Sequence, residues 1–307
     1  MAWFRRAFFF IGLNITVILM LSLVINLLGL RPYLSEHGID YGSLIGFCLV
    51  WGIGGAFISL MLSKTLAKQA MSLQVIDPRT TDPTTRDIVD TVHNLARAAG
   101  LRKMPEVAIY NSPEVNAFAT GPSKNNSLVA VSSGLLRTMD KRARDGVLGH
   151  EVAHIANGDM VTMTLLQGVV NAFVLAFARI IAFAIDAALR GDRDNRGGLG
   201  PATYLIVWLL ELLLFIPGSL LIAWFSRQRE YRADKGGARY AGRENMIHAL
   251  KTLLRVHELN EMPEVKEAAP SYAALKIDSP RRSTIALLMS THPPLEARIA
   301  RLERLTL

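Results

Sequence analysis

Near its midpoint the sequence reads Val147-Leu-Gly-His-Glu-Val-Ala-His-Ile-Ala-Asn-Gly-Asp159, with two histidines four residues apart around a glutamate. Positions four apart share one face of an α-helix, so His150 and His154 can bind one metal ion together. Glu151 is offset from that line and can reach a water molecule on the metal. A zinc ion would lower the pKa of that water, and Glu151 would take its proton. The stretch therefore predicts the metal-binding helix of a metallopeptidase.

The residues around the two histidines favour a buried helix over a chance match of three residues. Val152 and Ile155 are among the apolar positions beside the histidines, and Gly158 is suited to end the helix. Buried histidines need polar partners, and a single metal ion would satisfy both. The alternative, an ordinary helix with a coincidental motif, leaves the two side chains without such a partner.

The composition indicates a protein that is part membrane and part soluble. Half of the 307 residues are hydrophobic, and the mean hydropathy is +0.27, which is high for a soluble enzyme and low for a pure transporter. Cys48 is the single cysteine, so the sequence offers neither a disulfide framework nor a thiolate metal site. The formal net charge of +8 comes from basic residues that are scattered or flank apolar segments, which favours a membrane surface over nucleic acid as their partner.

Four apolar segments are long enough to cross a bilayer. They are Phe8–Leu30, Ser43–Leu62, Val161–Leu189 and Tyr204–Phe225. A cleaved signal peptide is the alternative for the first segment, but an obvious small-residue cleavage site is missing and a second apolar segment follows soon after. The second segment is rich in glycine, which indicates close helix packing. Pro217-Gly218 predicts a kink in the fourth segment.

Basic residues flank these segments on one side of the membrane. They are Arg5, Arg6, Lys64, Lys68, Arg227 and Arg229. The short connection of residues 31–40 carries Glu36 and Asp40 against one arginine. The positive-inside rule therefore predicts that the N-terminus and the soluble parts lie in the cytoplasm.

Two charged residues interrupt the third and fourth apolar segments at matching positions. Arg179 lies about as far before the connecting loop, residues 190–200, as Glu211 lies after it. In an antiparallel helix pair these side chains would meet at similar depth, and we expect them to form a buried ion pair. The alternative is that both segments are less deeply inserted and that the charges contact water.

Residues 64–159 contain the signals of helices and short strands. Asp82-Pro83 marks a helix start, with Asp as the cap and Pro in the first turn. The further predicted elements are strands at residues 106–110 and 127–132, a turn at Ser132-Ser133-Gly134 and a short helix at residues 135–139.

The C-terminal part is predicted to be helical around an irregular stretch. Arg243–Leu259 is amphipathic, and residues 261–278 lack periodicity and predict a loop. Pro294 begins a last helix, with Ile299, Leu302 and Leu305 inward and its arginine and glutamate residues outward.

A third metal ligand is predicted just beyond the fourth apolar segment. Glu230 and Asp234 are four residues apart and share a helical face. One carboxylate can complete a His-His-Glu zinc site, and the other can hold a ligand histidine by its free ring nitrogen. The alternative is a solvated charged helix with ordinary arginine–glutamate pairs.

The fold class that follows is α+β and mostly helical, with about four transmembrane helices. Its parts are an N-terminal transmembrane hairpin (residues 1–63), a cytoplasmic part with the metal-binding helix (64–159), a second apolar hairpin (160–226) and a second cytoplasmic part with the third ligand (227–307).

His150-Glu151-x-x-His154 followed by Glu230-x-x-x-Asp234 resembles the gluzincin metallopeptidases. With two apolar segments before the first motif and two between the motifs, the chain is similar to the HtpX family of heat-shock membrane proteases. The resemblance extends over nearly the whole chain and includes Ser290-Thr-His-Pro-Pro294. The CAAX prenyl proteases are more distant relatives.

The resemblance implies a zincin-like metalloprotease domain that holds one Zn²⁺ ion per chain. The implied zinc ligands are His150, His154 and Glu230. Glu151 is implied as the general base, and Asp234 as the carboxylate that holds a ligand histidine.

The resemblance also implies residues that contact the substrate. Asn116, Ala117, Phe118 and Ala119 are similar to the family's substrate-aligning edge strand, which would bind an extended peptide by strand addition. His292 is a candidate contact for the tetrahedral oxyanion, with a structural role at the start of the last helix as the alternative. Tyr231 is a second oxyanion candidate.

The implied function is a stress-response, quality-control metalloendopeptidase of the EC 3.4.24 type in the bacterial inner membrane. It would cleave misfolded or damaged membrane proteins on the cytoplasmic side, so its expected partners are polypeptides and the lipid bilayer, with no nucleic acid. His154 and Glu230 lie only a few residues from apolar segments, which favours substrates presented at the membrane. The alternatives are a prenyl-protein protease, a catalytically silent membrane scaffold and a transporter, although the sequence contains no internal repeat that would indicate a transporter.

Overall fold

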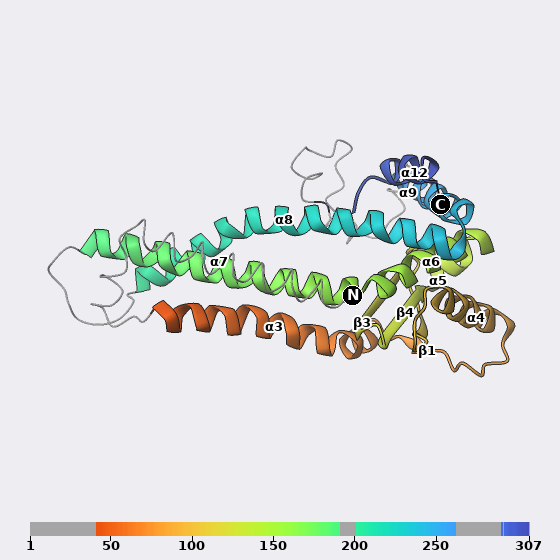
Figure 1. The fold of residues 1–307 in the computed structure, drawn as a ribbon, viewed down its shortest axis with the longest axis horizontal. Helices are drawn as coiled ribbons and strands as arrows, with labels where there is room; N and C mark the ends of the chain where they lie inside the picture. The colour runs from red at the N-terminus through yellow and green to blue at the C-terminus, as the bar shows by residue number, and fades with distance from the viewer. Residues whose placement is uncertain (1–40, 191–200, 262–289, 291, 307) are drawn as a thin grey trace. The chain divides into compact units, whose positions relative to one another are not determined.

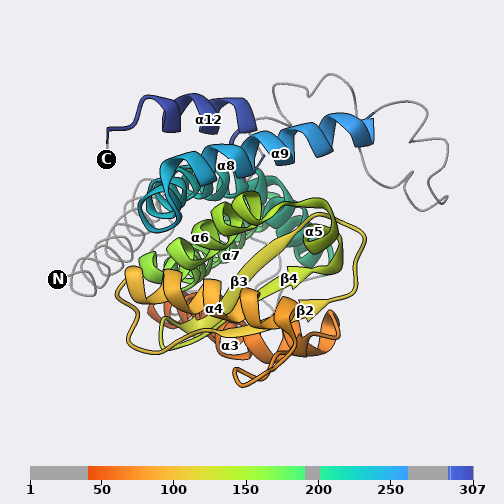
Figure 2. The same ribbon diagram turned by 90° about the vertical axis from the view of Figure 1, so that its right-hand side faces the viewer.

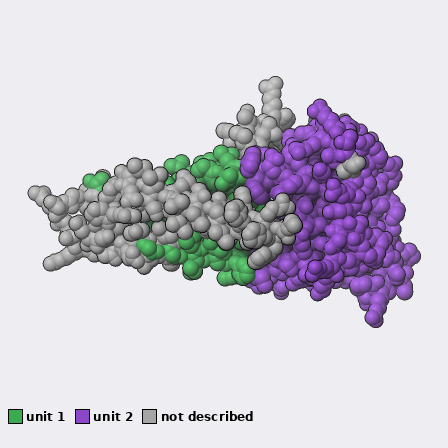
Figure 3. All heavy atoms as spheres, viewed as in Figure 1, with its two compact units in different colours: residues 1–59, 162–222 green, residues 60–161, 223–307 purple. Residues whose placement is uncertain are grey.

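A computed structural model describes residues 41–190, 201–261, 290 and 292–306 (Figure 1). The first predicted apolar segment, most of the loop predicted at residues 190–200 and nearly all of the one at residues 261–278 lie outside the described residues. The chain divides into two compact units, coloured separately in Figure 3. Unit 1 comprises Met1–Ser59 and Thr162–Ile222, and unit 2 comprises Leu60–Val161 and Ala223–Leu307.

Three long helices contribute to unit 1, namely α3 (Tyr41–Ala70), α7 (Asp159–Arg190) and α8 (Pro201–Ala241). Within the described part of the chain, these three are long and apolar enough to cross a membrane. Large apolar side chains such as Trp51 and Trp208 are exposed on them, as expected of side chains that face lipid. The second, third and fourth predicted apolar segments are therefore helical.

Glycine brings α3 and α7 into close contact within unit 1. A Cβ atom at Gly52 would lie 2.6 Å from the backbone nitrogen of Ala172, and one at Gly168 would lie 3.1 Å from the Cα atom of Ile53. Small residues of this kind allow helix backbones to approach closely in lipid. This confirms the expectation of glycine packing for part of the second apolar segment, whereas Gly54 meets no described atom within 4 Å.

The predicted pair of Arg179 and Glu211 is present in unit 1, but it is partly buried, with side chains 26% and 29% exposed. The Nη1 atom of Arg179 donates to Oε1 of Glu211 over 2.9 Å and to the carbonyl oxygen of Leu175 over the same distance. Asp186, another charged residue of α7, accepts a hydrogen bond from the hydroxyl of Thr203. The charges that interrupt the apolar segments thus have polar partners within the unit.

Unit 2 contains a four-stranded mixed sheet. Its strands are β1 (Gln74–Val75), β2 (Glu106–Tyr110), β3 (Ala117–Ser123) and β4 (Asn126–Ser132), in the order β1-β2-β4-β3. β2 and β4 pair in parallel, and the other pairs are antiparallel. The strands predicted at residues 106–110 and 127–132 are confirmed as β2 and β4. β1 was not predicted, because two exposed residues carry no periodic signal.

Two helices cover one face of this sheet (Figure 2). Helix α4 (Pro83–Ala98) begins as predicted, since the Asp82 side chain accepts a hydrogen bond from the backbone N–H of Thr85. Helix α6 (Lys141–Asn157) is the predicted metal-binding helix. The core between these helices and the sheet is apolar and includes Ile88, Val92, Leu95, Val107, Val129, Val131, Val152 and Ile155.

The turn predicted at Ser132-Ser133-Gly134 is instead the start of a helix. Ser132 caps α5 (Ser133–Thr138), because its hydroxyl accepts a hydrogen bond from the backbone N–H of Leu135. Ser132 ends β4 and caps α5 at once, so the chain passes from strand to helix without an intervening turn. Serine favours turns and helix caps for the same reason, its short hydrogen-bonding side chain.

The C-terminal helices are α9 (Arg243–Glu261) and α12 (Leu295–Glu303). Ile299 and Leu302 are buried against α9, as predicted. The outward placement predicted for every arginine of the last helix is wrong at one position, since Arg298 is only 7 % exposed. Its guanidinium is buried because it pairs with the Asp234 carboxylate of α8.

We expect the variant Glu211→Gln to unfold more easily than the native protein. It leaves the Arg179 charge without its described counterion inside an apolar unit, and the loss should be roughly 3 kcal/mol. Thermal or denaturant unfolding of the detergent-solubilised protein measures it. The matched control is Arg179→Gln combined with Glu211→Gln, which removes both charges and should recover most of the loss. Native stability in the single variant would mean that the two charges contact water.

Candidate metal centre

Helix α6 is fixed at both ends by its own sequence. The Asp140 side chain accepts a hydrogen bond from the backbone N–H of Ala143 at the N-terminus. Gly158 ends the helix with a φ of 68°, a left-handed conformation that glycine adopts without strain. His150 and Glu151 are buried, and His154 is nearly so. The helix therefore directs its polar motif into the interior of unit 2.

Helix α8 carries the third predicted ligand and packs closely against α6. A Cβ atom at Gly149 would lie 2.7 Å from the Cβ of Ala241, and one at Gly236 would lie 2.6 Å from the Cβ of Ala153. Gly237 lies under His150, since a Cβ there would be 3.0 Å from the His150 backbone nitrogen. These glycines let the two helices approach closely, which places Glu230 beside both histidines.

Three potential ligand atoms form a small triangle. The Nε2 atoms of His150 and His154 are 3.1 Å apart. Each of these nitrogens also lies 3.4 Å from an oxygen of Glu230, Oε2 for His150 and Oε1 for His154. These are the three predicted ligands, and the structure brings them together as a group that can hold a metal ion.

The triangle has the size that zinc requires. Four tetrahedral ligands at about 2.0–2.1 Å from zinc are separated from one another by about 3.3 Å. The distances of 3.1–3.4 Å fit this value. Two imidazoles and one carboxylate are also the donor set of zinc hydrolases, which keep a fourth position open. The residues present therefore fit a catalytic zinc ion.

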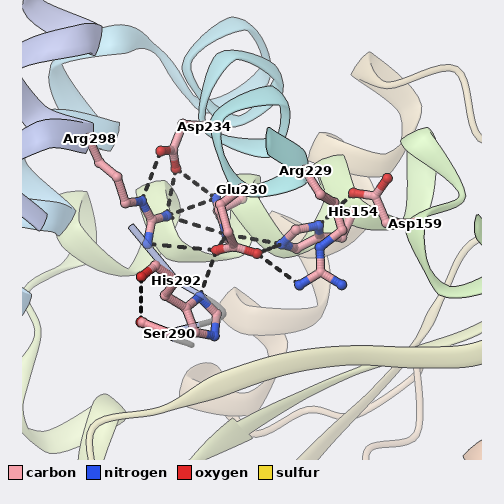
Figure 4. Close-up of polar contacts among 9 residues, drawn as sticks. His154, Asp159, Arg229, Glu230, Asp234, Ser290, His292 and Arg298 are labelled. Atoms are coloured by element: carbon pink, nitrogen blue, oxygen red, sulfur yellow. Dashed lines mark hydrogen bonds and ion pairs between the residues drawn. The ribbon is translucent and has the colours of Figure 1, made fainter. Parts of the chain in front are cut away.

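Each histidine is held from its far side by a carboxylate, and Figure 4 labels the two carboxylates, Asp159 and Asp234. The Nδ1 atom of His154 lies 2.7 Å from Oδ2 of Asp159, and the Nδ1 atom of His150 lies 3.0 Å from Oδ1 of Asp234. Such contacts fix the tautomer that leaves Nε2 free to bind a metal. Asp234 was predicted for this role. Asp159 was not, although it directly follows the glycine that ends α6.

Arg298 holds Asp234 in turn. Its Nε and Nη2 atoms donate to the two oxygens of Asp234 over 2.8 and 2.6 Å. A bidentate contact of this kind orients a carboxylate in two directions at once. Arg298 was not predicted for this role, although it lies only four residues beyond Pro294, the last residue of the C-terminal motif that resembles the protease family.

Glu230 accepts two further hydrogen bonds. The Nη2 atom of Arg229 donates to its Oε1 over 2.9 Å, and the Nδ1 atom of His292 donates to its Oε2 over 2.9 Å. His292 is largely exposed, whereas Glu230 is 1 % exposed. The structure therefore places His292 at the solvent side of the predicted ligand.

The protein groups around the two histidines favour their charged forms. Burial by itself lowers the pKa of His154, but hydrogen bonds to Asp159 and Glu230 outweigh it and raise the pKa to about 9. The pKa of His150 is raised in the same way, with burial opposed by hydrogen bonds to Asp234 and Glu230. Both imidazoles must lose a proton before they bind a metal.

The predicted substrate-contact residues lie at the edge of the sheet. β3 is an edge strand, paired on one side with β4 and containing Ala117, Phe118 and Ala119. It also packs against α6, the helix of the histidines. Asn116 precedes the strand, and its backbone N–H donates to the Ser132 hydroxyl. An edge strand beside the metal helix can pair with an extended peptide.

Tyr231, a predicted oxyanion contact, packs against Arg301. Its ring lies under the guanidinium of Arg301, at 4.5 Å from guanidinium carbon to ring centroid. Tyr231 and Asp234 line one cavity together. The tyrosine thus lies on the side of α8 that carries Asp234, while Glu230 faces the two ligand nitrogens.

Comparison with known proteins finds one peptidase family and several closely similar relatives. The model for Peptidase family M48 matches residues 82–306. A protease HtpX homolog of Methylacidiphilum infernorum is 49% identical over 302 residues, which cover 98% of this chain and 99% of the relative. A protease HtpX homolog of Bacillus licheniformis is 50% identical, covering 97% of this chain and 99% of the relative. Protease HtpX of Xanthomonas axonopodis pv. citri is 46% identical over 97% of both chains.

A solved structure shares the fold. The crystal structure of S. mikatae Ste24p superposes with a TM-score of 0.59, covering 95% of this chain and 67% of that chain. The sequences are only 16% identical over this match, so the likeness concerns the fold alone. It agrees with the mostly helical α+β class predicted from the sequence.

We expect the variant Gly149→Ala to bind zinc less tightly than the native protein. The added Cβ would push α8 away from α6 and spread the three ligands, at a cost of about 1–3 kcal/mol for the overpacked contact. A zinc competition titration with a fluorescent chelator measures the affinity. The matched control adds Ala241→Gly, which removes the atom that the new Cβ meets and should restore most of the affinity. Native affinity in the single variant would contradict the close contact.

We expect zinc binding to release protons and to strengthen with rising pH. Because the pKa of His154 is about 9, its ring is protonated at pH 7 once a chelator has removed all metal, and zinc must displace that proton. The apparent affinity should therefore rise from pH 6.5 to 8.5 and level off above about pH 9. Calorimetry in two buffers of different ionisation enthalpy counts the protons. An affinity that does not change with pH over this range would contradict the raised pKa.

Proposed function

The chain belongs to Peptidase family M48, and we propose that it is a zinc-dependent endopeptidase of the cell membrane. The observation that carries the proposal is the triangle of His150, His154 and Glu230, whose ligand atoms lie 3.1–3.4 Å apart. A carboxylate supports each histidine from behind, as is usual at zinc sites. A bound zinc ion supplies an activated water and a Lewis acid for the peptide carbonyl.

Glu151 acts as the general base of the reaction. It follows the first ligand histidine on α6 and is buried next to the ligands. Its carboxylate takes the proton of the attacking water and passes it to the leaving nitrogen of the peptide bond. The carboxylates of Asp159 and Asp234 keep the two histidines oriented during this transfer.

The substrate is an extended polypeptide that pairs with β3. The strand has a free edge in the described sheet, and its register with β4 orders Ala117, Phe118 and Ala119 along that edge. Main-chain hydrogen bonds would supply affinity, which suits an enzyme that cleaves many sequences. Such tolerance fits the removal of misfolded or damaged membrane proteins.

The membrane orientation follows from the charges at the ends of the apolar helices. Lys64 and Lys68 follow the second apolar segment, and both pair with Glu106 of β2. Arg227 and Arg229 follow the fourth segment, shortly before Glu230. The positive-inside rule then assigns unit 2 to the cytoplasm, so that cleavage occurs on the cytoplasmic side of a bacterial inner membrane. In this proposal the membrane part corresponds to the predicted apolar segments within residues 1–63 and 160–226.

We expect Glu151→Gln to abolish casein cleavage without loss of zinc. The amide keeps the shape of the side chain but cannot take a proton, so kcat/KM should fall by roughly 10²-fold or more. The protein is purified with a chelator to prevent self-cleavage, and zinc is then restored and counted. Glu258→Gln, the same change at an exposed site on α9, serves as the control and should keep native activity. Full activity in Glu151→Gln would remove this residue from the mechanism.

A further inference from the structure

A second polar cavity lies beside Asp234 in unit 2, and we call it the basic pocket. Its volume is about 220 Å³, and its walls come from α8, α12 and the residues that follow α12. The charged and aromatic lining residues are Tyr231, Arg232, Asp234, Lys235, Arg298 and Arg301. The zinc ligands themselves do not line this cavity.

The basic pocket has an excess of positive charge. Four lining side chains are cationic and one is anionic. Among the residues that the structure describes, Arg232, Lys235 and Arg301 form no ion pair with a carboxylate. The Arg301 guanidinium is instead held over the Tyr231 ring at 4.5 Å from the ring centroid. Cations gathered around a cavity create a positive potential that attracts an anion.

The floor of the basic pocket is connected to the zinc site. Asp234 is 2 % exposed and Arg298 is 7 % exposed, so their bidentate pair is desolvated. The same Asp234 oxygen that accepts from Arg298 over 2.6 Å lies 3.0 Å from Nδ1 of His150. Arg298 also lies 3.8 Å from Glu230. One buried ion pair thus separates the basic pocket from two of the proposed ligands.

We propose that the basic pocket binds a phosphate group, supplied by an anionic phospholipid headgroup or by free phosphate, and that its occupation strengthens zinc binding at the neighbouring site. Guanidinium groups suit phosphate because they donate two parallel hydrogen bonds to its oxygens. Arg232 and Lys235 follow the end of the fourth apolar segment, Phe225, by ten residues or fewer. Basic clusters so close to a membrane segment are typical of lipid headgroup recognition.

The direction of the coupling follows from charge. The cations of the basic pocket repel a divalent ion on the other side of the Asp234–Arg298 pair, and a bound phosphate neutralises them. A phosphate that binds Arg298 also weakens the pairing of Arg298 with Asp234, so that the Asp234 carboxylate interacts more strongly with His150. Because coupling between two binding sites is reciprocal, zinc also strengthens phosphate binding. The coupling, unlike the phosphate site itself, rests on the proposed zinc function.

The test measures zinc affinity by competition with a fluorescent chelator, using the full chain in detergent. The additives are dihexanoyl phosphatidylglycerol, inorganic phosphate and dihexanoyl phosphatidylcholine, the last as a zwitterionic control. With the anionic lipid, we expect the zinc dissociation constant to fall by roughly fivefold or more. An equal effect of inorganic phosphate supports the site and identifies free phosphate as a sufficient ligand. An effect of the anionic lipid alone supports the site and identifies the headgroup.

Variants separate the basic pocket from general charge effects. The triple variant Arg232→Gln, Lys235→Gln, Arg301→Gln should lose the response to the anionic additive. The matched control, Arg239→Gln, Arg255→Gln, Arg304→Gln, removes three exposed cations outside the pocket and should keep it. Lys235→Gln alone, at an exposed position, should weaken the response in part and guards against misfolding of the triple variant. An unchanged response in the triple variant overturns the proposal.

A direct measurement of phospholipid binding tests the phosphate site independently of zinc and of peptidase activity. Line broadening of the lipid ³¹P resonance reports binding to the protein after chelator treatment, without zinc or peptidase activity. Binding that the triple variant loses supports the phosphate site even if the chain takes up no zinc, a result that would refute only the proposed function. A native protein that binds zinc and cleaves casein, yet broadens no ³¹P resonance, overturns the phosphate site.

Discussion

The close approach of α6 and α8 is the constraint on which the site depends. Both helices lack a side chain where they meet, at Gly149 on one and at Gly236 and Gly237 on the other. Any Cβ there would lie 2.6–3.0 Å from an atom of the opposite helix. The ligand triangle tolerates little separation of the helices, because zinc–ligand distances vary by only about 0.2 Å. The glycines that cost helix propensity are therefore positioned where backbone proximity decides metal geometry.

The charges around the triangle favour a divalent cation. Four buried carboxylates, one buried guanidinium and one partly buried guanidinium surround the triangle, namely Glu151, Asp159, Glu230, Asp234, Arg298 and Arg229. The excess of two negative charges is costly in an apolar interior unless a cation balances it. Two protonated histidines can do so, and the hydrogen bonds to Asp159 and Glu230 accordingly raise the pKa of His154 to about 9. A zinc ion with two neutral imidazoles balances the same excess.

Local sequence patterns predicted the elements of the site, but not all contacts between residues that are far apart in the sequence. The spacing of His150 and His154 and that of Glu230 and Asp234 each report one helix face, which the sequence states directly. The pairing of Arg179 with Glu211 was predictable because an antiparallel hairpin relates their depths. The burial of Arg298 was not, since amphipathic periodicity assigns every arginine to the solvent face. Only the tertiary contact with Asp234 reverses that assignment.

Helix starts were predicted well where one residue serves one role. Asp82 is such a case, whereas Ser132 ends a strand and caps a helix at once, and the sequence pattern favoured a turn. The strand at Gln74–Val75 is set by pairing with β2 and not by its own residues. The sheet order, with β3 at the edge, likewise depends on contacts between distant segments.

X-ray absorption at the zinc K-edge is the decisive measurement, because it reports which atoms bind the metal. In the purified, zinc-loaded protein the ion should be four-coordinate. Its spectrum should show two imidazole ligands and oxygen ligands at about 2.0–2.1 Å, with no sulfur. Replacing Glu230 with Gln should change the oxygen shell while both imidazoles remain. A zinc ion with no imidazole shell, or one with six oxygen ligands, would contradict the assignment of His150, His154 and Glu230.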